Sequence, residues 1–182
     1  MEYQIIHSDR KTMALQIKDG ALIVRVPKKA KKADIDALIE SHRPWIEKHL
    51  QKAEACRQAA EKLEPLSYEE IQKLADQAMK VIPERVKYYA PLIGVTYGRI
   101  TIRNQRTKWG SCTSTGNLNF NCLLMLTPPE VIDSIVVHEL CHRKEMNHSS
   151  RFYAEVLRVF PDYRKWENWL KDNGSILLQR MR

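Results

Sequence analysis

The apolar positions near the amino terminus fall in short runs rich in β-forming residues. Residues 3–27 form β-rich runs on either side of Asp19-Gly20, and Pro27 ends the second run. Asp-Gly between two such runs is typical of a hairpin turn. The amino-terminal part is therefore predicted to be a small β-hairpin or sheet.

The apolar spacing then becomes that of an α-helix. Asp34 is a predicted N-cap, and apolar residues recur at helical spacing over residues 35–50. Pro44 interrupts this pattern, so we expect a break just before it, near residues 42–43. Residues 51–66 are rich in Ala, Lys, Glu and Gln and predict an exposed helix that links two halves of the chain.

The second half alternates between helical and strand patterns. Ser67 and Glu70 form a capping box, and the helix that follows is predicted to close at Ala90-Pro91. Residues 95–103 and 117–126 predict strands, with a polar, basic loop between them. Together these patterns indicate an α+β fold.

The clearest helix start in the chain is the segment Thr127-Pro128-Pro129-Glu130. Thr127 is the predicted cap, Pro128 suits the first helical position, and Glu130 completes a capping box. The residues that follow are apolar nearly all round the helix, which predicts that this helix is buried.

Composition narrows the class of protein. The chain has 182 residues, and no apolar stretch is long enough for a transmembrane span. Its amino terminus lacks the apolar core of a signal peptide. The four cysteines fit neither a disulfide framework nor a Cys-type zinc ribbon. We therefore expect a cytoplasmic protein with reduced thiols and no membrane partner.

The net charge of +8, with the basic run at residues 28–32, favours anionic partners such as nucleic acid, nucleotides or acidic peptide. Charge patterning alone is also what a solvated loop before a helix gives. The basic surface is thus a candidate for nucleic-acid binding on the basis of its charge alone.

The buried helix carries the pattern H-E-x-x-H. His138 and His142 project from one face, one turn apart, which lets two imidazoles share one tetrahedral zinc ion. Glu139 need not ligate and is placed to take a proton from a metal-bound water. We therefore predict one catalytic zinc ion with Glu139 as general base.

A catalytic zinc site needs a third protein ligand. His148 is the favoured candidate, because Met146-Asn147 can end the helix and let the chain swing back toward the metal. Glu155, on the next predicted helix, is the main rival.

Two segments, RTKWGSCTSTGNLNFNCLLMLTPPEVID and VVHELCHRKEMNHSSRFY, resemble the YgjP-like metal-dependent hydrolases, which are relatives of the SprT-like zinc metallopeptidases. The resemblance implies zinc at His138, His142 and His148, Glu139 as the base, and a minimal zincin core. It covers most of the chain. We therefore predict one domain over residues 1–182, with an N-terminal β/α part (1–66) and a zincin-like core (67–182).

The first functional hypothesis is a zinc metallopeptidase. The strand near residues 117–122 is a candidate for pairing with an extended peptide substrate, and Asn117, Asn119 and Asn121 alternate along it. Ordinary turn and edge-strand polarity is the favoured explanation of these asparagines over substrate contact. Tyr153 is a candidate for oxyanion stabilisation or for packing.

Two alternatives use the basic residues. A nucleotide phosphohydrolase, of the nucleoside triphosphate pyrophosphatase type, would bind phosphate through basic residues near the motif: Arg103, Arg106, Lys108, Arg143 and Lys144. A DNA-associated protease or binding module would stack a base on Trp109. Arg106 and Trp109 are therefore the predicted substrate-binding residues, although a lone tryptophan more often packs in a core.

Overall fold

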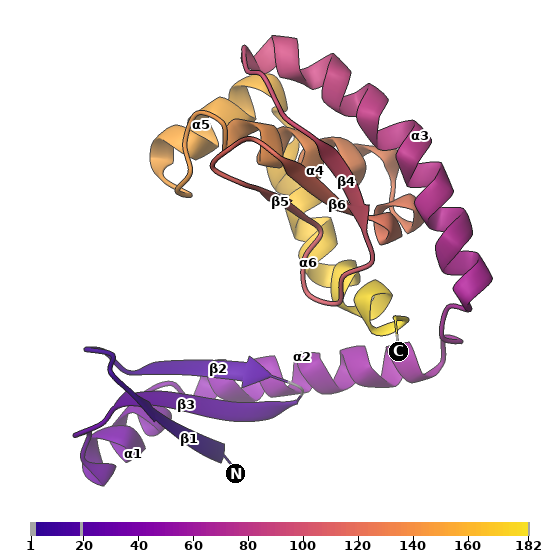
Figure 1. Cartoon of the computed structure of the whole chain (residues 1–182). Helices are drawn as coiled ribbons and strands as arrows, with labels where there is room; N and C mark the ends of the chain where they lie inside the picture. The colour runs from indigo at the N-terminus through magenta and orange to yellow at the C-terminus, as the bar shows by residue number, and fades with distance from the viewer. Residues whose placement is uncertain (1–2, 19, 182) are drawn as a thin grey trace. The chain divides into compact units, whose positions relative to one another are not determined.

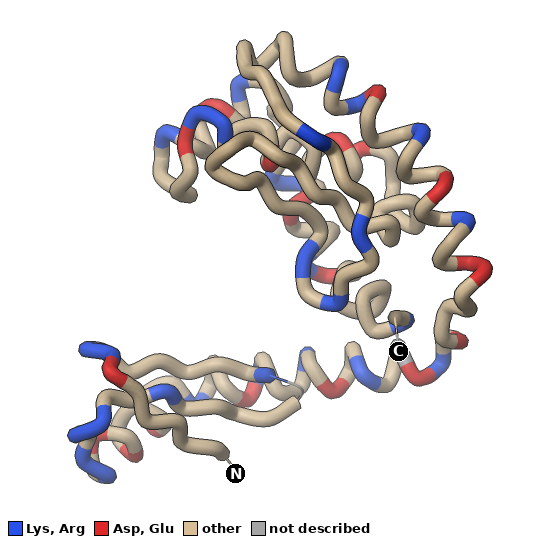
Figure 2. The backbone as a smooth tube through the Cα atoms, in the orientation of Figure 1, with Lys and Arg blue, Asp and Glu red and all other residues tan. Residues whose placement is uncertain are grey.

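The computed structural model describes residues 3–18 and 20–181. These described residues form an α+β fold of two small three-stranded sheets, six α-helices and one 3₁₀-helix (Figure 1). The chain divides into two compact units, Met1–Lys62 and Leu63–Arg182. Lysine and arginine occur in both units, and one group of them gathers at an end of the amino-terminal sheet (Figure 2).

The amino-terminal unit packs two helices on one sheet. Its elements are β1 (Tyr3–Ser8), β2 (Ala14–Lys18), β3 (Ala21–Pro27), α1 (Lys32–Ser41) and α2 (Arg43–Glu61). The central strand β3 runs parallel to β1 and antiparallel to β2. Alternate residues of β3 point into a core that also holds one residue from each helix; this core comprises Leu22, Val24, Val26, Ile35 and Ile46.

Most of the local predictions for this unit hold. Lys18 pairs with Ala21 across the predicted hairpin, although Asp19 itself lies outside the described residues. The break before Pro44 is confirmed, because α1 ends at Ser41 and α2 begins at Arg43. The predicted cap is wrong: the extended residue that precedes α1 is Lys31, and Asp34 lies in the first turn. A carboxylate there still interacts favourably with the helix dipole.

In the carboxy-terminal unit, helices pack against one three-stranded sheet. Its elements are α3 (Tyr68–Ile93), β4 (Ile100–Arg103), β5 (Gly110–Cys112), β6 (Leu118–Asn121), the 3₁₀-helix η1 (Cys122–Leu126), α4 (Pro129–Cys141), α5 (Ser150–Val159) and α6 (Tyr163–Gln179). The strand order is β4-β6-β5, with β6 parallel to β4 and antiparallel to β5.

The capping box of Ser67 and Glu70 at the start of α3 is confirmed. This helix runs past its predicted end and closes at Gly94, whose backbone takes the left-handed φ of 78° and whose N–H donates to the carbonyl groups of Ala90 and Pro91. A glycine adopts this conformation without steric cost.

The strand predictions were too long. Only residues 100–103 of the predicted strand 95–103 pair in the sheet, and the predicted strand 117–126 turns into η1 after Asn121. The expected pairing of this strand with a substrate is wrong, because β6 has a neighbour on each side and no free edge. The loop between the two predicted strands contributes its last residues to the edge strand β5.

Helix α4 begins one position later than predicted. Pro128 is extended, with φ −54° and ψ 146°, because the ring of the following Pro129 disfavours helical backbone in the residue before it. Thr127 is therefore not the cap, and its hydroxyl instead donates to the carbonyl group of Leu124 at 2.7 Å. Most of α4 is buried, including Val136, Val137 and Leu140, which are fully inaccessible.

An ion pair joins α4 to α3. The Asp133 carboxylate accepts two hydrogen bonds of 2.6 Å from Arg85 and one of 3.1 Å from the Tyr89 hydroxyl. Asp133 is buried, so these bonds offset the cost of removing its charge from water. They fix the rotation of the helix that carries the H-E-x-x-H motif.

Within the described part of the chain, no helix combines the length and the apolarity that a bilayer span requires.

Candidate metal centre

Three histidines meet where α4 ends. His138 lies in the last turn of α4, His142 follows its end, and His148 lies just before α5. Ligand nitrogens from the three rings all lie within 4.8 Å of one another, and the Nε2 atoms of His138 and His148 are 3.0 Å apart. The structure thus brings together all three residues that the sequence singled out as zinc ligands.

The Phe152 ring packs against all three histidine rings, a contact that the sequence pattern did not reveal. Its ring centroid lies 4.9 Å from that of His138, 4.6 Å from that of His142 and 5.0 Å from that of His148. Phe152 is fully buried, and its N–H donates to the Ser149 hydroxyl that caps α5. The Ser149 cap therefore fixes the position of Phe152, next to His148 in the cluster.

The outer nitrogens of two rings are held by the protein. His142 Nδ1 donates to the carbonyl group of Glu145 at 3.0 Å, and His138 Nδ1 lies 2.8 Å from the Tyr163 hydroxyl oxygen. A ligating histidine usually donates its other ring N–H to such a partner, which sets the tautomer. Both contacts leave Nε2 free to face the centre of the cluster.

This donor set fits zinc. Burial and the neighbouring imidazoles lower the pKa of His138 to about 3, and burial also lowers the pKa of His142, so both rings are neutral near pH 7. Neutral imidazoles are zinc ligands, and tetrahedral bonds of about 2.0–2.1 Å place ligand nitrogens roughly 3.3 Å apart. The observed separations need only small side-chain adjustments to reach that spacing.

Tyr163 is a missed residue of the site, because it lies on α6 and no local pattern links it to His138. We expect Tyr163→Phe to weaken zinc binding about 10–100-fold, since the variant removes the oxygen that orients His138. Competition with a chelating indicator measures the change. Tyr88→Phe, on an exposed part of α3, is the matched control and should bind zinc like the parent.

The rival ligand Glu155 is engaged elsewhere. Its carboxylate lies 2.6 Å from Lys144 Nζ and 2.7 Å from Arg158 Nη2. Hydrogen bonds and charge from these two cations lower the pKa of Glu155 to about 2. The group of potential ligands found among the described residues contains the three histidines and not Glu155.

Glu155→Gln should therefore keep full zinc occupancy and affinity while lowering the free energy of unfolding at pH 7 by about 1–2 kcal/mol. The folded-state pKa, about 2, lies below the ordinary 4.5, so this stability is fully present above pH 4.5. It is lost as pH falls toward 2. Urea titrations of both proteins between pH 3 and pH 7 should show the difference shrinking with acid, whereas loss of zinc would support ligation by Glu155.

Glu139 follows His138 on α4, and its side chain packs against the sheet. It is 5% exposed, and burial raises the pKa of its carboxyl group to about 8, against a smaller lowering by the charge of Lys108. A divalent cation next to it would favour the ionised form. The carboxylate packs directly on Gly110 of β5: a Cβ atom built there would lie 2.6 Å from Glu139 Oε1.

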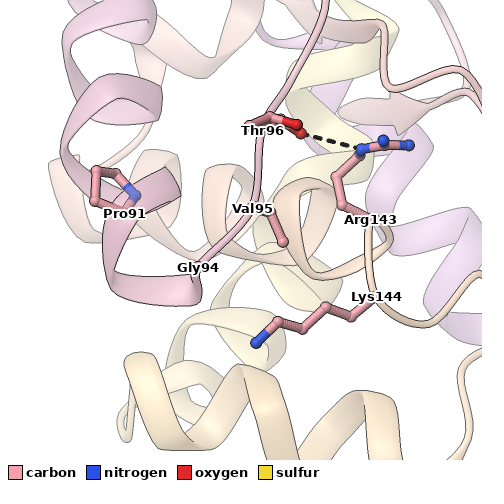
Figure 3. A pocket seen from close by; sticks show the side chains of 6 residues that line it. All are labelled: Pro91, Gly94, Val95, Thr96, Arg143 and Lys144. Carbon is pink, nitrogen blue, oxygen red and sulfur yellow. Dashed lines mark hydrogen bonds between the residues drawn. The ribbon is translucent and has the colours of Figure 1, made fainter.

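The basic pair that follows the motif is bound by the protein itself. Arg143 donates from Nε to the carbonyl group of Thr96 at 3.1 Å and from Nη1 to that of Ser114 at 3.0 Å. Lys144 pairs with Glu155. Figure 3 shows both side chains beside an open cavity of about 480 Å³. These contacts give the pair structural roles and do not favour its predicted role in phosphate binding.

The two predicted substrate-binding residues lie in different surroundings. Arg106 is exposed in the connection between β4 and β5. Trp109 is half-buried and packs on the main core, where a Cβ atom built on Gly174 of α6 would lie 3.1 Å from its ring. This placement favours packing for Trp109. Tyr153 lies under the Arg164 guanidinium, 4.1 Å from ring centroid to Cζ.

Two solved structures are similar to parts of this chain. One is the metallopeptidase zymogen of Pyrococcus abyssi abylysin, with a TM-score of 0.46 and 22% identity over 50% of this chain and 91% of that one. The other is the metallopeptidase zymogen of Methanocaldococcus jannaschii jannalysin, with a TM-score of 0.45 and 22% identity over 50% of this chain and 95% of that one. A comparison with curated proteins gave no match.

A family model matches far more of the chain. The YgjP-like metallopeptidase domain aligns with residues 11–74 and 60–173, a span that includes the three histidines, Glu139 and Gly110. The match agrees with the resemblance noted in the sequence, and its carboxy-terminal part contains the complete histidine cluster. The chain therefore belongs to the YgjP-like family of metallopeptidase domains.

Proposed function

We propose that this chain is a zinc metallopeptidase in which His138, His142 and His148 hold one zinc ion and Glu139 is the general base. The observation that supports it most is the convergence of three imidazoles at the end of the helix that also carries the buried Glu139 carboxylate. The cluster offers nitrogen ligands and leaves a fourth position open, as catalytic zinc sites do. Glu139 directly follows the ligand candidate His138 on α4, and its buried carboxylate packs against Gly110 of β5.

The edge of β5 supports a peptide as substrate. Trp109 C=O accepts from Asn121 N–H, and Thr113 N–H donates to Asn117 C=O, so the odd-numbered residues of this segment face β6. The N–H and C=O groups of Gly110 and Cys112 consequently face the free edge, because these groups alternate along an antiparallel strand. An extended peptide added there would lie beside Glu139.

The chemistry follows from this arrangement. A zinc ion held by His138, His142 and His148 would supply a Lewis acid and lower the pKa of a water molecule to about 7. Glu139 takes the proton from the attacking water and later delivers it to the leaving amine. Tyr163 and the carbonyl group of Glu145 would hold the outer ring nitrogens of His138 and His142, and so orient these two rings.

The experiment is mass spectrometry of an unfolded-protein mixture incubated with zinc-loaded protein, with the Glu139→Gln variant as control. We expect new peptide termini that are absent from the control. A parallel incubation with nucleoside triphosphates tests the competing chemistry. Release of phosphate or pyrophosphate, without new peptides from protein shown to carry zinc, would replace the peptidase by a phosphohydrolase.

A further inference from the structure

We propose that Gly110 and Asn121 are positioning residues for Glu139, and this rests on the proposed role of Glu139 as base. Gly110 leaves room for the carboxylate to lie flat on the backbone of β5. A Cβ atom built on Gly110 would lie 2.6 Å from Oε1, 2.8 Å from Cγ and 3.0 Å from Cδ of Glu139. Any other residue at this position would therefore displace the carboxyl group.

Asn121 fixes the position of the backbone segment that leads to Gly110. It is fully buried, and its Nδ2 donates to the carbonyl groups of Gln105 at 2.6 Å and Lys108 at 2.9 Å. Its Oδ1 accepts from the N–H of Leu123 at 3.1 Å, and its own N–H donates to the carbonyl group of Trp109 at 2.9 Å. Only an amide side chain supplies this combination of two donors and one acceptor.

Trp109 also anchors this segment, through its side chain. Its ring packs on α6 at Gly174, where a Cβ atom would come within 3.1 Å of the indole. The backbone from Lys108 to Gly110 is thus held both by Asn121 and by the packing of Trp109 on α6. This arrangement gives the sequence motif Lys-Trp-Gly-Ser-Cys a role: it sets the position of a carboxylate that lies about thirty residues later in the chain.

A base must be held near its working position, because a displacement of about 1 Å can cost roughly 100-fold in rate. We therefore expect Gly110→Ala and Asn121→Asp to lower kcat about 10–100-fold, with a smaller change in KM. Zinc stoichiometry and affinity should stay at the parent values, since neither residue contacts the histidine cluster. Zinc titration and thermal unfolding of both variants check metal binding and folding.

Gly98→Ala is the matched control. A Cβ atom at Gly98 would approach a side-chain oxygen at the same 2.6 Å, but that oxygen belongs to Asn117 rather than Glu139. The kcat of Gly98→Ala should match that of the parent protein. Gly110→Ala should also have little further effect when Glu139 is already Gln, because the group that it displaces no longer acts.

Parent-like kcat in Gly110→Ala, or an equal loss in the Glu139→Gln background, would overturn the positioning role. Loss of zinc in Gly110→Ala would also overturn it, because the effect would then act through the ligands. If Glu139→Gln itself stays active, the proposed mechanism fails, and that result is distinct from failure of the positioning role.

A second, independent observation concerns the amino-terminal unit. Because β1 runs parallel to β3, with Ser8 opposite Pro27, the connections that follow these strands lie at the same end of the sheet. An ion pair of 2.8 Å between Lys28 and Asp9 joins the two connections. This basic end comprises Arg10, Lys11, Lys28, Lys29, Lys31 and Lys32 (Figure 2).

The basic end carries little opposing charge. Asp9 is the only acidic residue in the segments 9–13 and 27–32. Helix α1 also begins here, and its N-cap Lys31 makes no side-chain hydrogen bond to the first turn. The partial positive charge of the helix start therefore adds to that of the lysines, against the single carboxylate of Asp34.

We infer that the basic end binds the phosphate backbone of nucleic acid. A membrane-binding patch would include large apolar residues beside the lysines. The exposed large hydrophobic residues described in this unit are Tyr3, Ile5 and Trp45, and none lies in the two basic segments. Lysines without apolar neighbours suit sequence-independent contacts with phosphates, which depend on charge.

The test compares two triple variants with the same charge. Lys29, Lys31 and Lys32 changed to Gln lower the net charge from +8 to +5, and so do Lys73, Lys80 and Lys87 on α3. Fluorescence anisotropy with a double-stranded DNA oligonucleotide should show at least tenfold weaker binding for the first variant only. The slope of log affinity against log salt should fall by up to roughly 2.7 for the same variant.

Equal weakening by the two triple variants would show that net charge, and not the basic end, governs binding, and would overturn the inference. Parent protein that binds phosphatidylserine vesicles but not DNA would also overturn it, since the partner would then be a membrane surface.

Discussion

Glu139→Gln is expected to lower kcat by about 10²–10⁴-fold while zinc binding stays intact. A positioned general base contributes roughly this factor, and Gln has the shape of Glu but cannot accept the proton. Glutamine also fits the space beside Gly110, where the carboxylate is in close contact with the backbone. The measurement is kcat and KM on a peptide found by mass spectrometry, with zinc content determined on the same sample.

The pattern of the kinetic loss is informative. A fall in kcat and in kcat/KM by the same factor would place the role of Glu139 in the transition state. Parent-like kcat in zinc-loaded Glu139→Gln would rule out Glu139 as the base. Glu139→Asp is a useful second variant, because it keeps the carboxylate but withdraws it from β5, and it should fall between the parent and Glu139→Gln.

His148→Ala is expected to raise the dissociation constant for zinc by more than about 100-fold. The loss of a partner that only orients a ligand costs about 10–100-fold, and the loss of a direct ligand should exceed that. His148 is the most exposed of the three histidines and comes from outside α4, so the fold should survive its truncation. Stabilisation by excess zinc should shrink by about 2.7 kcal/mol for each 100-fold loss of affinity.

The control for His148→Ala is His7→Ala, which removes an exposed histidine of the amino-terminal unit. It should keep parent-like zinc affinity in the same competition titration. Unchanged affinity in His148→Ala would mean that the third ligand is a different residue, and Glu155→Gln would then be the next variant to titrate.

Sequence reasoning succeeded where the signal is local. The capping box of Ser67 and the spacing of His138 and His142 depend on residues within one turn of each other. It also anticipated the break before Pro44. It misplaced the start of α4 because two prolines compete for that position, and the steric demand of the second one decides.

The sequence patterns did not predict contacts between segments that are distant in the chain. Tyr163 contacts His138 from α6, which α5 and two connections separate from α4. The Glu139 carboxylate, on α4, contacts Gly110 of β5. Asn121 appeared as one of three alternating polar residues of a strand, and its burial is what gives it a separate role. Only the folded arrangement distinguishes such residues from neighbours of the same type.

The side chain of Arg143 connects the proposed metal centre to the edge strand β5. It follows His142 directly and bonds the turn after β5 through the carbonyl group of Ser114, while Gly116 lies flat beneath the guanidinium. These contacts connect the turn after the edge strand to the residue that follows the proposed zinc ligand His142. If binding of a peptide at β5 changes the affinity for zinc, thermodynamic reciprocity requires zinc to change the affinity for that peptide by the same factor.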